Sequence, residues 1–247
     1  MANQPQAAAG AVQRPLWFSP PDVDESPRRG LTRERVVAEA LTVISTDGAG
    51  ALSMRALATR LGVVPGALYR HVRSKEQLLD LVVDGVLAEV GGQPGHPLAW
   101  AEQVKVLAHR LRAVLEDHPG IAGLLKTRDP LGPHSLALAE AFLVPLQAAG
   151  LPERETALAF SLIYDYTLGF ALSDRTTVNE QRVQDTATRR RLHAFFRSLP
   201  ADRFPALAAL GEHIWAGNRD QRFAASLDTL LAGIETARRR NGRRPRP

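Results

Sequence analysis

The stretch SMRALATRLGVVPGALYRHVRSKEQL, residues 53–78, contains two short helical patterns on either side of a three-residue turn. Ser53 can cap the first helix, and Gly62 is the kind of residue that ends one. Pro65 lacks an amide hydrogen and therefore suits the first turn of a second helix, which we expect to reach about His71. This spacing is typical of a helix-turn-helix, whose second helix can lie in the major groove of DNA.

The second helix of this motif begins with small residues, which allow close contact with base edges and thymine methyl groups. Behind them stand a tyrosine, an arginine and a histidine that can hydrogen-bond to phosphates, and Lys75 opens the next helix. Arg55 is the candidate for bidentate contact to a guanine edge. With two arginines that precede the first helix, the predicted DNA-binding residues are Arg28, Arg29, Ser53, Arg55, Val64, Pro65, Gly66, Ala67, Tyr69, Arg70, His71 and Lys75.

Charge is distributed unevenly along the chain. Residues 28–75 hold nine Lys and Arg against three acidic residues, whereas residues 76–237 hold 15 basic and 20 acidic residues. A basic module on a mildly acidic body predicts a polyanionic partner at one end of the molecule. Charge alone equally fits a solvated surface, and Tyr69 also fits half-buried packing with its hydroxyl in water.

The remaining sequence is also helical in pattern, and strand-like alternation is nearly absent. Thr32 can cap a helix that ends near Asp47, and Ser74 with Gln77 matches a capping box that opens a fourth helix. A hinge-like break is expected at residues 91–97. Beyond it, helices are expected near 98–117, 119–126, 133–149, 153–173, 181–197 and 219–240.

Other classes of protein lack support in the sequence. No run approaches the roughly 18 to 20 apolar residues of a membrane span, and no secretory signal pattern is present, so a cytoplasmic location is expected. The chain has no cysteine, and its histidines lack zinc-type spacing. No nucleotide-binding loop or hydrolase motif occurs. We therefore predict no catalytic residues, no metal, no cofactor and no enzyme activity.

Residues 31–86 resemble the DNA-binding domain of the TetR family of transcriptional repressors. The resemblance is carried by Ala51-Leu52-Ser53-Met54-Arg55, Leu57-Ala58, Leu61-Gly62-Val63, Leu68-Tyr69-Arg70-His71-Val72 and Lys75. Trp100 and the stretches HPG (118–120), TRD (127–129) and YDYTLGF (164–170) resemble the tetracycline-repressor type of C-terminal domain. In all, the resemblance covers about residues 31–240.

The resemblance implies a homodimer that binds a palindromic operator and releases it when a small molecule enters the C-terminal domain. It implies that Arg55 reads a base, that Pro65 to Ala67 face the major groove, and that Tyr69, His71 and Lys75 hold phosphates. The implied organisation is all-α. It comprises a flexible N-terminal arm (1–30), a three-helix helix-turn-helix domain (31–77), a larger helical ligand-binding and dimerisation domain (78–240) and a basic tail (241–247).

For the inducer, the resemblance suggests a bulky hydrophobic molecule. By approximate position, the candidate pocket residues are Val106, Arg110, Leu124, Arg128, Phe142 and Tyr164. Gly91 and Leu124 stand where the tetracycline repressor has histidines that help to hold a magnesium–drug chelate, so such a chelate is not expected here.

Two apolar stripes at helical spacing can form a four-helix bundle across a two-fold axis. The predicted dimer residues are Leu158, Leu162, Phe223, Leu227, Leu230, Leu231 and Ile234. The alternative is that both stripes face the protomer's own core. A structural DNA-binding protein without an inducer is a second hypothesis for the whole chain, against which the large acidic body argues.

Overall fold

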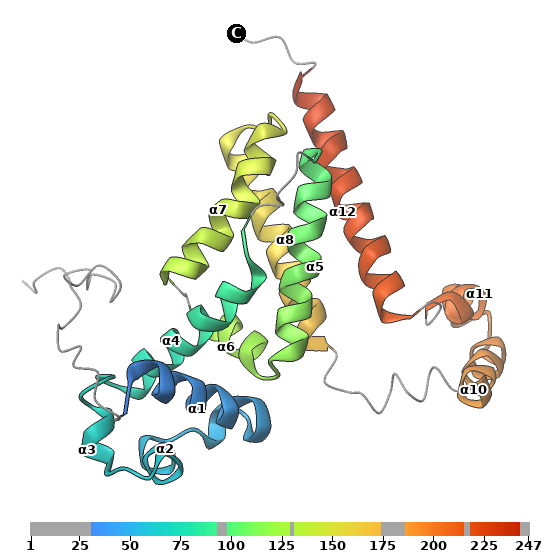
Figure 1. The fold of residues 1–247 in the computed structure, drawn as a ribbon. Coiled ribbons are helices and arrows are strands. Elements are labelled where there is room, and N and C mark those ends of the chain that lie inside the picture. The colour runs from blue at the N-terminus through green and yellow to red at the C-terminus, as the bar shows by residue number, and fades with distance from the viewer. Residues whose placement is uncertain (1–30, 93–97, 129–130, 174–185, 215–217, 243–247) are drawn as a thin grey trace, which may run out of the picture.

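The computed structural model describes residues 31–92, 98–128, 131–173, 186–214 and 218–242, and within these ranges every regular element is a helix (Figure 1). The all-α prediction is therefore confirmed. The α-helices are α1 (Arg33–Asp47), α2 (Met54–Leu61), α3 (Pro65–Leu68), α4 (Lys75–Leu87), α5 (Trp100–Asp117), α6 (Ile121–Thr127), α7 (Pro133–Ala148), α8 (Glu153–Ser173), α10 (Thr186–Arg197), α11 (Pro205–Ile214) and α12 (Arg219–Gly242), with short 3-10 turns at Ala49–Ala51 and Ala88–Val90.

Helices α1 to α3 form a small N-terminal unit, residues 31–74, which we call the head. The predicted caps are present: Thr32, Ser53 and Ser74 each accept a hydrogen bond from a backbone N–H three residues further on, at 3.1–3.2 Å. Gly62 adopts the left-handed conformation, with φ of 69°, which a residue without Cβ reaches without strain. These local signals fix where α1, α2 and α4 begin and where α2 ends.

The second helix of the motif is shorter than predicted. Helix α3 ends at Leu68, and residues 69–71 form a turn in which the His71 N–H donates to the Leu68 carbonyl at 2.9 Å. The prediction that this helix reaches His71 is corrected accordingly. Bonds three residues apart wind the backbone more tightly than an α-helix, which changes the direction of the side chains that follow.

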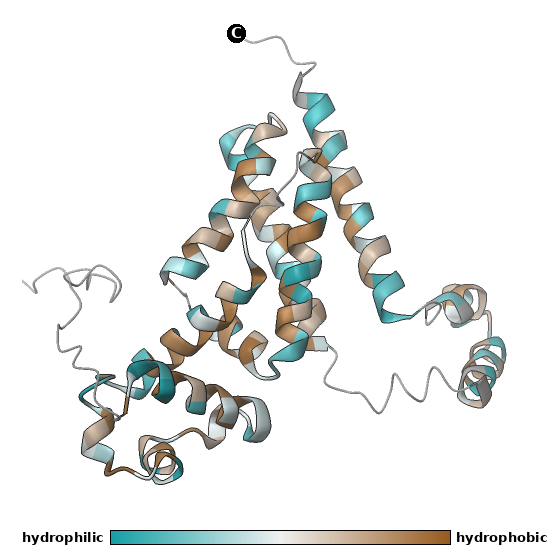
Figure 2. Cartoon of the chain, in the orientation of Figure 1, coloured by the Kyte–Doolittle hydropathy of each residue, from teal (hydrophilic) through white to brown (hydrophobic). Residues whose placement is uncertain are grey.

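Helix α4 connects the head to the rest of the chain, which we call the body. It packs on α1 of the head and on α6 and α7 of the body (Figure 1). The proposed domain boundary at residue 77 falls within this continuous helix. Its buried side chains, such as Leu78, Val82, Val83 and Val86, form a stripe that joins the cores of both units. Figure 2 shows hydrophobic residues on the facing sides of these helices.

In the body, α5, α7 and α8 pack against one another, and α12 runs along α8 at one side (Figure 1). Arg112 of α5 is 5% exposed and lies over the rings of Phe170 and Phe223, at 5.3 and 4.9 Å from their centroids. Its Nη2 donates to Asp220 on α12 at 2.5 Å. This cluster joins three helices through one buried cation and two aromatic rings.

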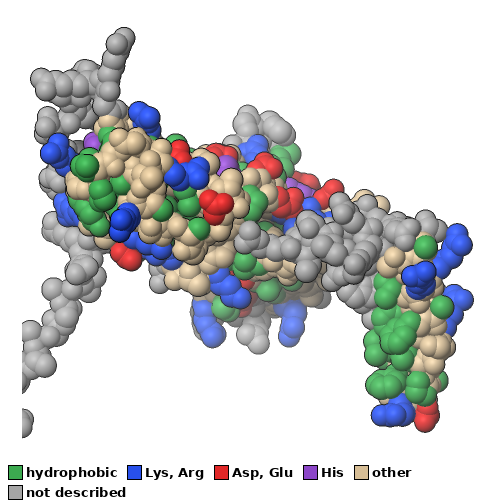
Figure 3. Space-filling view, turned by 90° about the horizontal axis from the view of Figure 1, so that it is seen from below, with side chains coloured by type: hydrophobic (Ala, Val, Ile, Leu, Met, Phe, Trp, Pro, Cys, Tyr) green, Lys and Arg blue, Asp and Glu red, His purple; other side chains and the backbone are tan. Residues whose placement is uncertain are grey.

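Helices α10 and α11 pack against each other as a hairpin that projects away from the body (Figure 1). The predicted 181–197 helix is observed from Thr186, and residues 181–185 lie outside the described residues. Hydrophobic side chains form a strip along this hairpin (Figure 3), and those that are exposed are Phe195, Phe204, Leu207 and Leu210. Among the described residues, no helix is long and apolar enough to cross a membrane.

Candidate nucleic-acid interface

The face of the head formed by the α2–α3 turn exposes large side chains that none of the described residues covers. Val64 is 72% exposed and Tyr69 is 53% exposed, although both lie in a well-packed unit. Arg55, Pro65, Gly66 and Arg70 are exposed with them. Figure 3 views the molecule from below and shows lysine and arginine side chains distributed around the head. The surface therefore combines positive charge with apolar and aromatic contact area, as a DNA-contacting surface does.

The buried side chains beneath this face explain its orientation. Leu57 and Ala58 of α2 and Leu68 of α3 are at most 1% exposed, and Val72 just after the turn is 1% exposed. Because these residues anchor α2 and α3 from below, the residues between them point outward. Ala67, His71 and Lys75 are half-buried at the edge of the face.

One residue of this face was missed by the sequence reasoning. The Nε of Arg33, at the start of α1, donates to the His71 carbonyl at 3.1 Å. This bond fixes the end of the turn that presents Tyr69 and Arg70. Arg33 directly follows the capping residue of α1, and a cation is unfavourable at a helix N-terminus. This unfavourable position was the sequence signal that Arg33 has a partner outside its own helix.

Three of the predicted residues have a different status in the structure. The Ser53 hydroxyl is already engaged as the cap of α2, where it accepts from the Ala56 N–H at 3.1 Å. Arg28 and Arg29 lie outside the described residues. Arg60, by contrast, is basic and exposed but pairs with Glu39 at 2.6 Å, so its charge is compensated within the head.

The head is held to the body by polar contacts along α4. Arg128, just after α6, donates from Nε to Asp80 Oδ1 at 2.7 Å and from Nη2 to the Glu76 carbonyl at 2.9 Å. A Cβ at Gly120, where φ is 97°, would lie only 3.1 Å from Ile44 of α1. The N-terminus of α6 thus sits directly on the first helix of the head.

A cavity of about 460 Å³ opens beside this junction, between α6 and α8. It is lined by Leu125, Lys126, Thr127, Arg128, Tyr164, Asp165 and Leu168. Burial raises the pKa of Tyr164 to about 12, so its phenol remains protonated at neutral pH and can donate a hydrogen bond. The same Arg128 that contacts α4 therefore lines a cavity with room for a small molecule.

Of the six predicted pocket residues, the structure brings Arg128 and Tyr164 together at this cavity. Phe142 is fully buried and Leu124 is 9% exposed, so both are core residues of the body. Arg110 is exposed and donates to the Gly92 carbonyl at 3.1 Å, while Val106 is half-buried on the same helix. Val106, Arg110, Leu124 and Phe142 do not line this cavity, and their assignment to a ligand pocket, made by approximate position from the family resemblance, stays a prediction.

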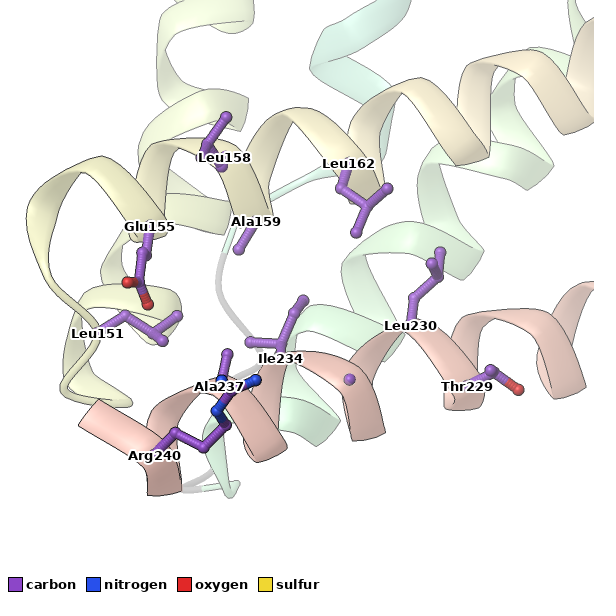
Figure 4. A pocket seen from close by; sticks show the side chains of 11 residues that line it. Leu151, Glu155, Leu158, Ala159, Leu162, Thr229, Leu230, Ile234, Ala237 and Arg240 are labelled. Atoms are coloured by element: carbon purple, nitrogen blue, oxygen red, sulfur yellow. The ribbon is translucent and has the colours of Figure 1, made fainter. Parts of the chain in front are cut away.

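An open apolar groove of about 760 Å³ lies between α8 and α12 (Figure 4). Leu158 is 57% exposed and Leu162 is 46% exposed, and both belong to its lining. Leu230 and Ile234 of α12 face the same groove in Figure 4. Exposed leucines gathered on one face are unusual for a surface that contacts only water, and they are typical of an interaction surface.

Most of the α12 stripe is covered within the single chain. Its members Phe223, Leu227, Leu231 and Ile234 are at most 7% exposed in the single chain. Phe223 stacks on Tyr166 of α8 with ring centroids 5.3 Å apart, and the Tyr166 hydroxyl donates to the Phe223 carbonyl at 3.0 Å. Phe223, Leu227 and Leu231 are therefore covered largely within one protomer, whereas Ile234 also lines the groove, and the assignment of these residues to a dimer interface stays a prediction.

Comparisons with known proteins agree with this geometry. Residues 36–82 match the model of the bacterial regulatory proteins of the tetR family, and residues 93–238 match that of the tetracyclin repressor-like C-terminal domain. An HTH-type transcriptional regulator of Saccharopolyspora erythraea is 35% identical over 204 residues, which are 82% of either chain. The HTH-type transcriptional repressor DrrR1 of Streptomyces coeruleorubidus is 28% identical over 230 residues, covering 89% of this chain and 83% of DrrR1.

Among solved structures, the TetR family protein ActR of Streptomyces coelicolor in complex with actinorhodin is similar to this chain. The TM-score is 0.73 at 34% sequence identity, and the match covers 85% of this chain and 99% of ActR. The likeness therefore extends over the head and the body together.

Proposed function

Because the chain belongs to the tetR family of transcriptional regulators and is not an enzyme, we propose that it is a ligand-responsive repressor. In this proposal a homodimer binds a palindromic operator through the α2–α3 face of each head, and a small molecule in the body releases it. The observation that carries the proposal is the exposure of Val64 and Tyr69 on a basic helix-turn-helix whose first helix is capped at both ends, by Ser53 and Gly62. Such a repressor acts in the cytoplasm, where the chromosome lies.

The proposed division of labour in the head follows from position and chemistry. Arg55, in the first turn of α2, reads a base edge, and the small residues 65–67 lie against the floor of the major groove. Tyr69, Arg70 and Lys75 bind phosphates, and Lys75 does so at the N-terminus of α4, where backbone amides add to its charge. The residues 1–30, with Arg28 and Arg29, are proposed to add minor-groove contacts.

A dimer is needed because a palindrome has two half-sites about 34–36 Å apart, and one chain presents one head. The groove between α8 and α12 is the surface proposed to close this dimer. Leu158, Leu162 and Leu230 of one protomer would pack against the same residues of its partner in an isologous contact. The buried part of the α12 stripe supports the groove from behind.

The inducer is proposed to enter the body and to act on α4. The relative DrrR1 is a transcriptional repressor, and the structure of ActR contains actinorhodin. These two relatives support the proposal that this chain represses transcription and binds a ligand. The cavity beside α6 offers apolar contact through Leu125 and Leu168 and hydrogen bonds through Tyr164. A hydrophobic molecule with at least one hydrogen-bond acceptor fits this lining.

The proposal is tested by binding the protein to the DNA upstream of its own gene, measured by fluorescence anisotropy at two salt concentrations. The wild type should select one defined site over random duplex, and Arg55→Ala should cost about 1–3 kcal/mol at one base position. Tyr69→Ala should weaken binding to all sequences alike, because it removes a phosphate contact. Arg154→Ala, exposed at the start of α8, is the control and should change nothing.

The inducer arm of the proposal uses the same complex. A panel of hydrophobic compounds is added, and release of the DNA by one chemical class is the expected result. Tyr164→Phe, which keeps the ring and removes the hydroxyl, should raise the concentration needed for release. A wild-type protein with no preference for any site refutes operator binding, and release that is unchanged in Tyr164→Phe refutes the role of this cavity.

A further inference from the structure

A buried carboxylate joins the helix that leaves the head to the first turn of α7. Asp84, in the middle of α4, is 2% exposed. Its Oδ1 accepts from the Ser135 backbone N–H at 2.9 Å and from the Ser135 hydroxyl at 3.0 Å. Its Oδ2 accepts from the His134 N–H at 3.4 Å.

This arrangement explains how a buried acid is tolerated in a largely apolar helix. An isolated carboxylate is costly to bury, but hydrogen bonds from backbone N–H groups to an ionised acceptor are among the stronger ones. The positive end of the α7 dipole lies at the same place, since α7 begins at Pro133. Because these hydrogen bonds are directional, they favour one angle between α4 and α7.

Gly132 makes the joint tight. A Cβ built at Gly132 would overlap with the Asp84 carboxylate, whose atoms occupy that space. Its φ of −73° is ordinary for any residue, so the demand for glycine comes from the close approach of the two helices and not from backbone conformation. The Asp84 carboxylate fills the space between α4 and the start of α7 beside Gly132, so the two helices cannot tilt toward each other there without displacing it.

The same rigid helix carries the head. Lys75 begins α4 and Asp84 lies nine residues further along, about 14 Å at 1.5 Å per residue. A second polar contact, from Arg128 to Asp80, lies one turn closer to the head. A change of tilt at Asp84 is therefore carried along the helix to the DNA-contacting face, where one base-pair step is only about 3.4 Å.

We propose that Asp84, Gly132 and Ser135 form a positioning joint that sets the separation of the two heads, and with it the half-site spacing that the dimer prefers. The inference rests on the proposed function, since spacing has meaning only for a dimer on a two-part operator. The three residues contact no DNA in this account and act through α4. Weakening the joint should therefore alter the preferred half-site spacing more than it alters the affinity for a single half-site.

The separation of the heads can be measured without DNA. The chain has no cysteine, so Ala38→Cys, at an exposed position of α1, gives one spin label per protomer. Electron–electron resonance should report one narrow distance for the dimer. Gly132→Ala should broaden or shift this distance, because the added methyl group pushes α4 and α7 apart.

Matched variants separate the joint from general destabilisation. Gly85→Ala changes the residue next to Asp84 on the same helix, where a Cβ meets nothing within 4 Å, and should leave the distance narrow. Asp84→Asn keeps the size of the side chain but turns an NH₂ group toward one of the two N–H donors, and should broaden the distance. Ser135→Ala loses only the hydroxyl bond and should have a smaller effect. Thermal melting of each variant identifies any that has failed to fold.

The functional test uses operators whose half-sites are separated by one base pair more or fewer. For Gly132→Ala and Asp84→Asn, the affinity for the operator of native spacing should fall by about tenfold or more, measured relative to the affinity of the same variant for a half-site duplex. The control Gly85→Ala should bind both duplexes as the wild type does. Equal losses on every duplex, or an unchanged distance in both variants, overturns the joint. A wild type that shows no inter-protomer distance or no defined site refutes the proposed function, and the joint with it.

Discussion

The two sides of the body differ in how completely the single chain satisfies them. On the α4 side, the buried Asp84 and the half-buried Arg128 find their partners within the chain. On the α8–α12 side, Leu158 and Leu162 remain about half exposed over an open groove. On the first side the described residues satisfy one another, whereas the second side has apolar area that the described residues leave uncovered.

This difference separates two kinds of interaction energy. Directional hydrogen bonds at the α4 side fix an angle between helices, and they lose value quickly when that angle changes. Apolar contact at the α8–α12 side is non-directional and scales with the area covered. In the proposed repressor, the hydrogen bonds would orient the heads and the apolar contact would hold two protomers together.

The largest expected effect is on the uncovered side. Leu158→Asp combined with Leu162→Asp places two charges in the groove, and the dimer dissociation constant should rise by about two orders of magnitude or more. Analytical ultracentrifugation measures this directly. Val144→Asp, which changes an equally exposed residue on α7 outside the groove, is the control and should leave the dimer intact. A dimer that survives the double substitution would move the interface elsewhere.

A smaller effect is expected beneath the groove, where α12 is held to the body. Arg112→Ala removes the buried cation that pairs with Glu116 and Asp220 and packs over two rings. The free energy of unfolding should fall by about 2 kcal/mol, below the value for a fully buried pair because Asp220 is 80% exposed. Urea denaturation measures the change, and Arg110→Ala, exposed on the same helix, should change stability by less than about 0.5 kcal/mol.

The smallest effect concerns pH. Burial lowers the pKa of His109, whose ring lies edge-on to Phe223 at 5.0 Å. A histidine with a lowered pKa in the folded state favours folding above its unfolded pKa, near 6.5, and this stability is lost as the pH falls below that value. Between pH 7.5 and 5, the melting temperature of the wild type should fall more than that of His109→Gln. Parallel curves for the two proteins would show that His109 stays solvated.

Much of the head could be predicted from residues next to one another in the sequence. Ser53, Gly62 and Pro65 act on the backbone within one helical turn, so their caps and breaks were correct. The end of α3 was not, because whether the backbone continues after Leu68 depends on Arg33 and Val72, which are held by other parts of the fold. Exposure of Tyr69 likewise required knowing what packs beneath it.

In the body the limits of periodicity are more evident. The α12 stripe was recognised, but a stripe shows only that one face is apolar and not whether α8 or a partner protomer covers it. Phe142 and Leu124 are buried in the body, and no periodic pattern shows whether such a residue also lines a ligand pocket. Asp84 was overlooked altogether, although an acidic residue amid Leu81, Val82, Val83 and Val86 is a signal of a buried polar contact.

By itself, the sequence determined that the chain is helical, where most helices start, and that a basic helix-turn-helix precedes an acidic body. Those properties depend on local backbone chemistry and composition, which act over a few residues. Only the tertiary structure decided that Asp84 meets α7, that Arg128 links a cavity to α4, and that Leu158 and Leu162 stay uncovered while Phe223 does not. The hydrogen bonds of Asp84 to Ser135 and of Arg128 to Asp80 join residues 51 and 48 positions apart, and how the helices pack decides which residues meet.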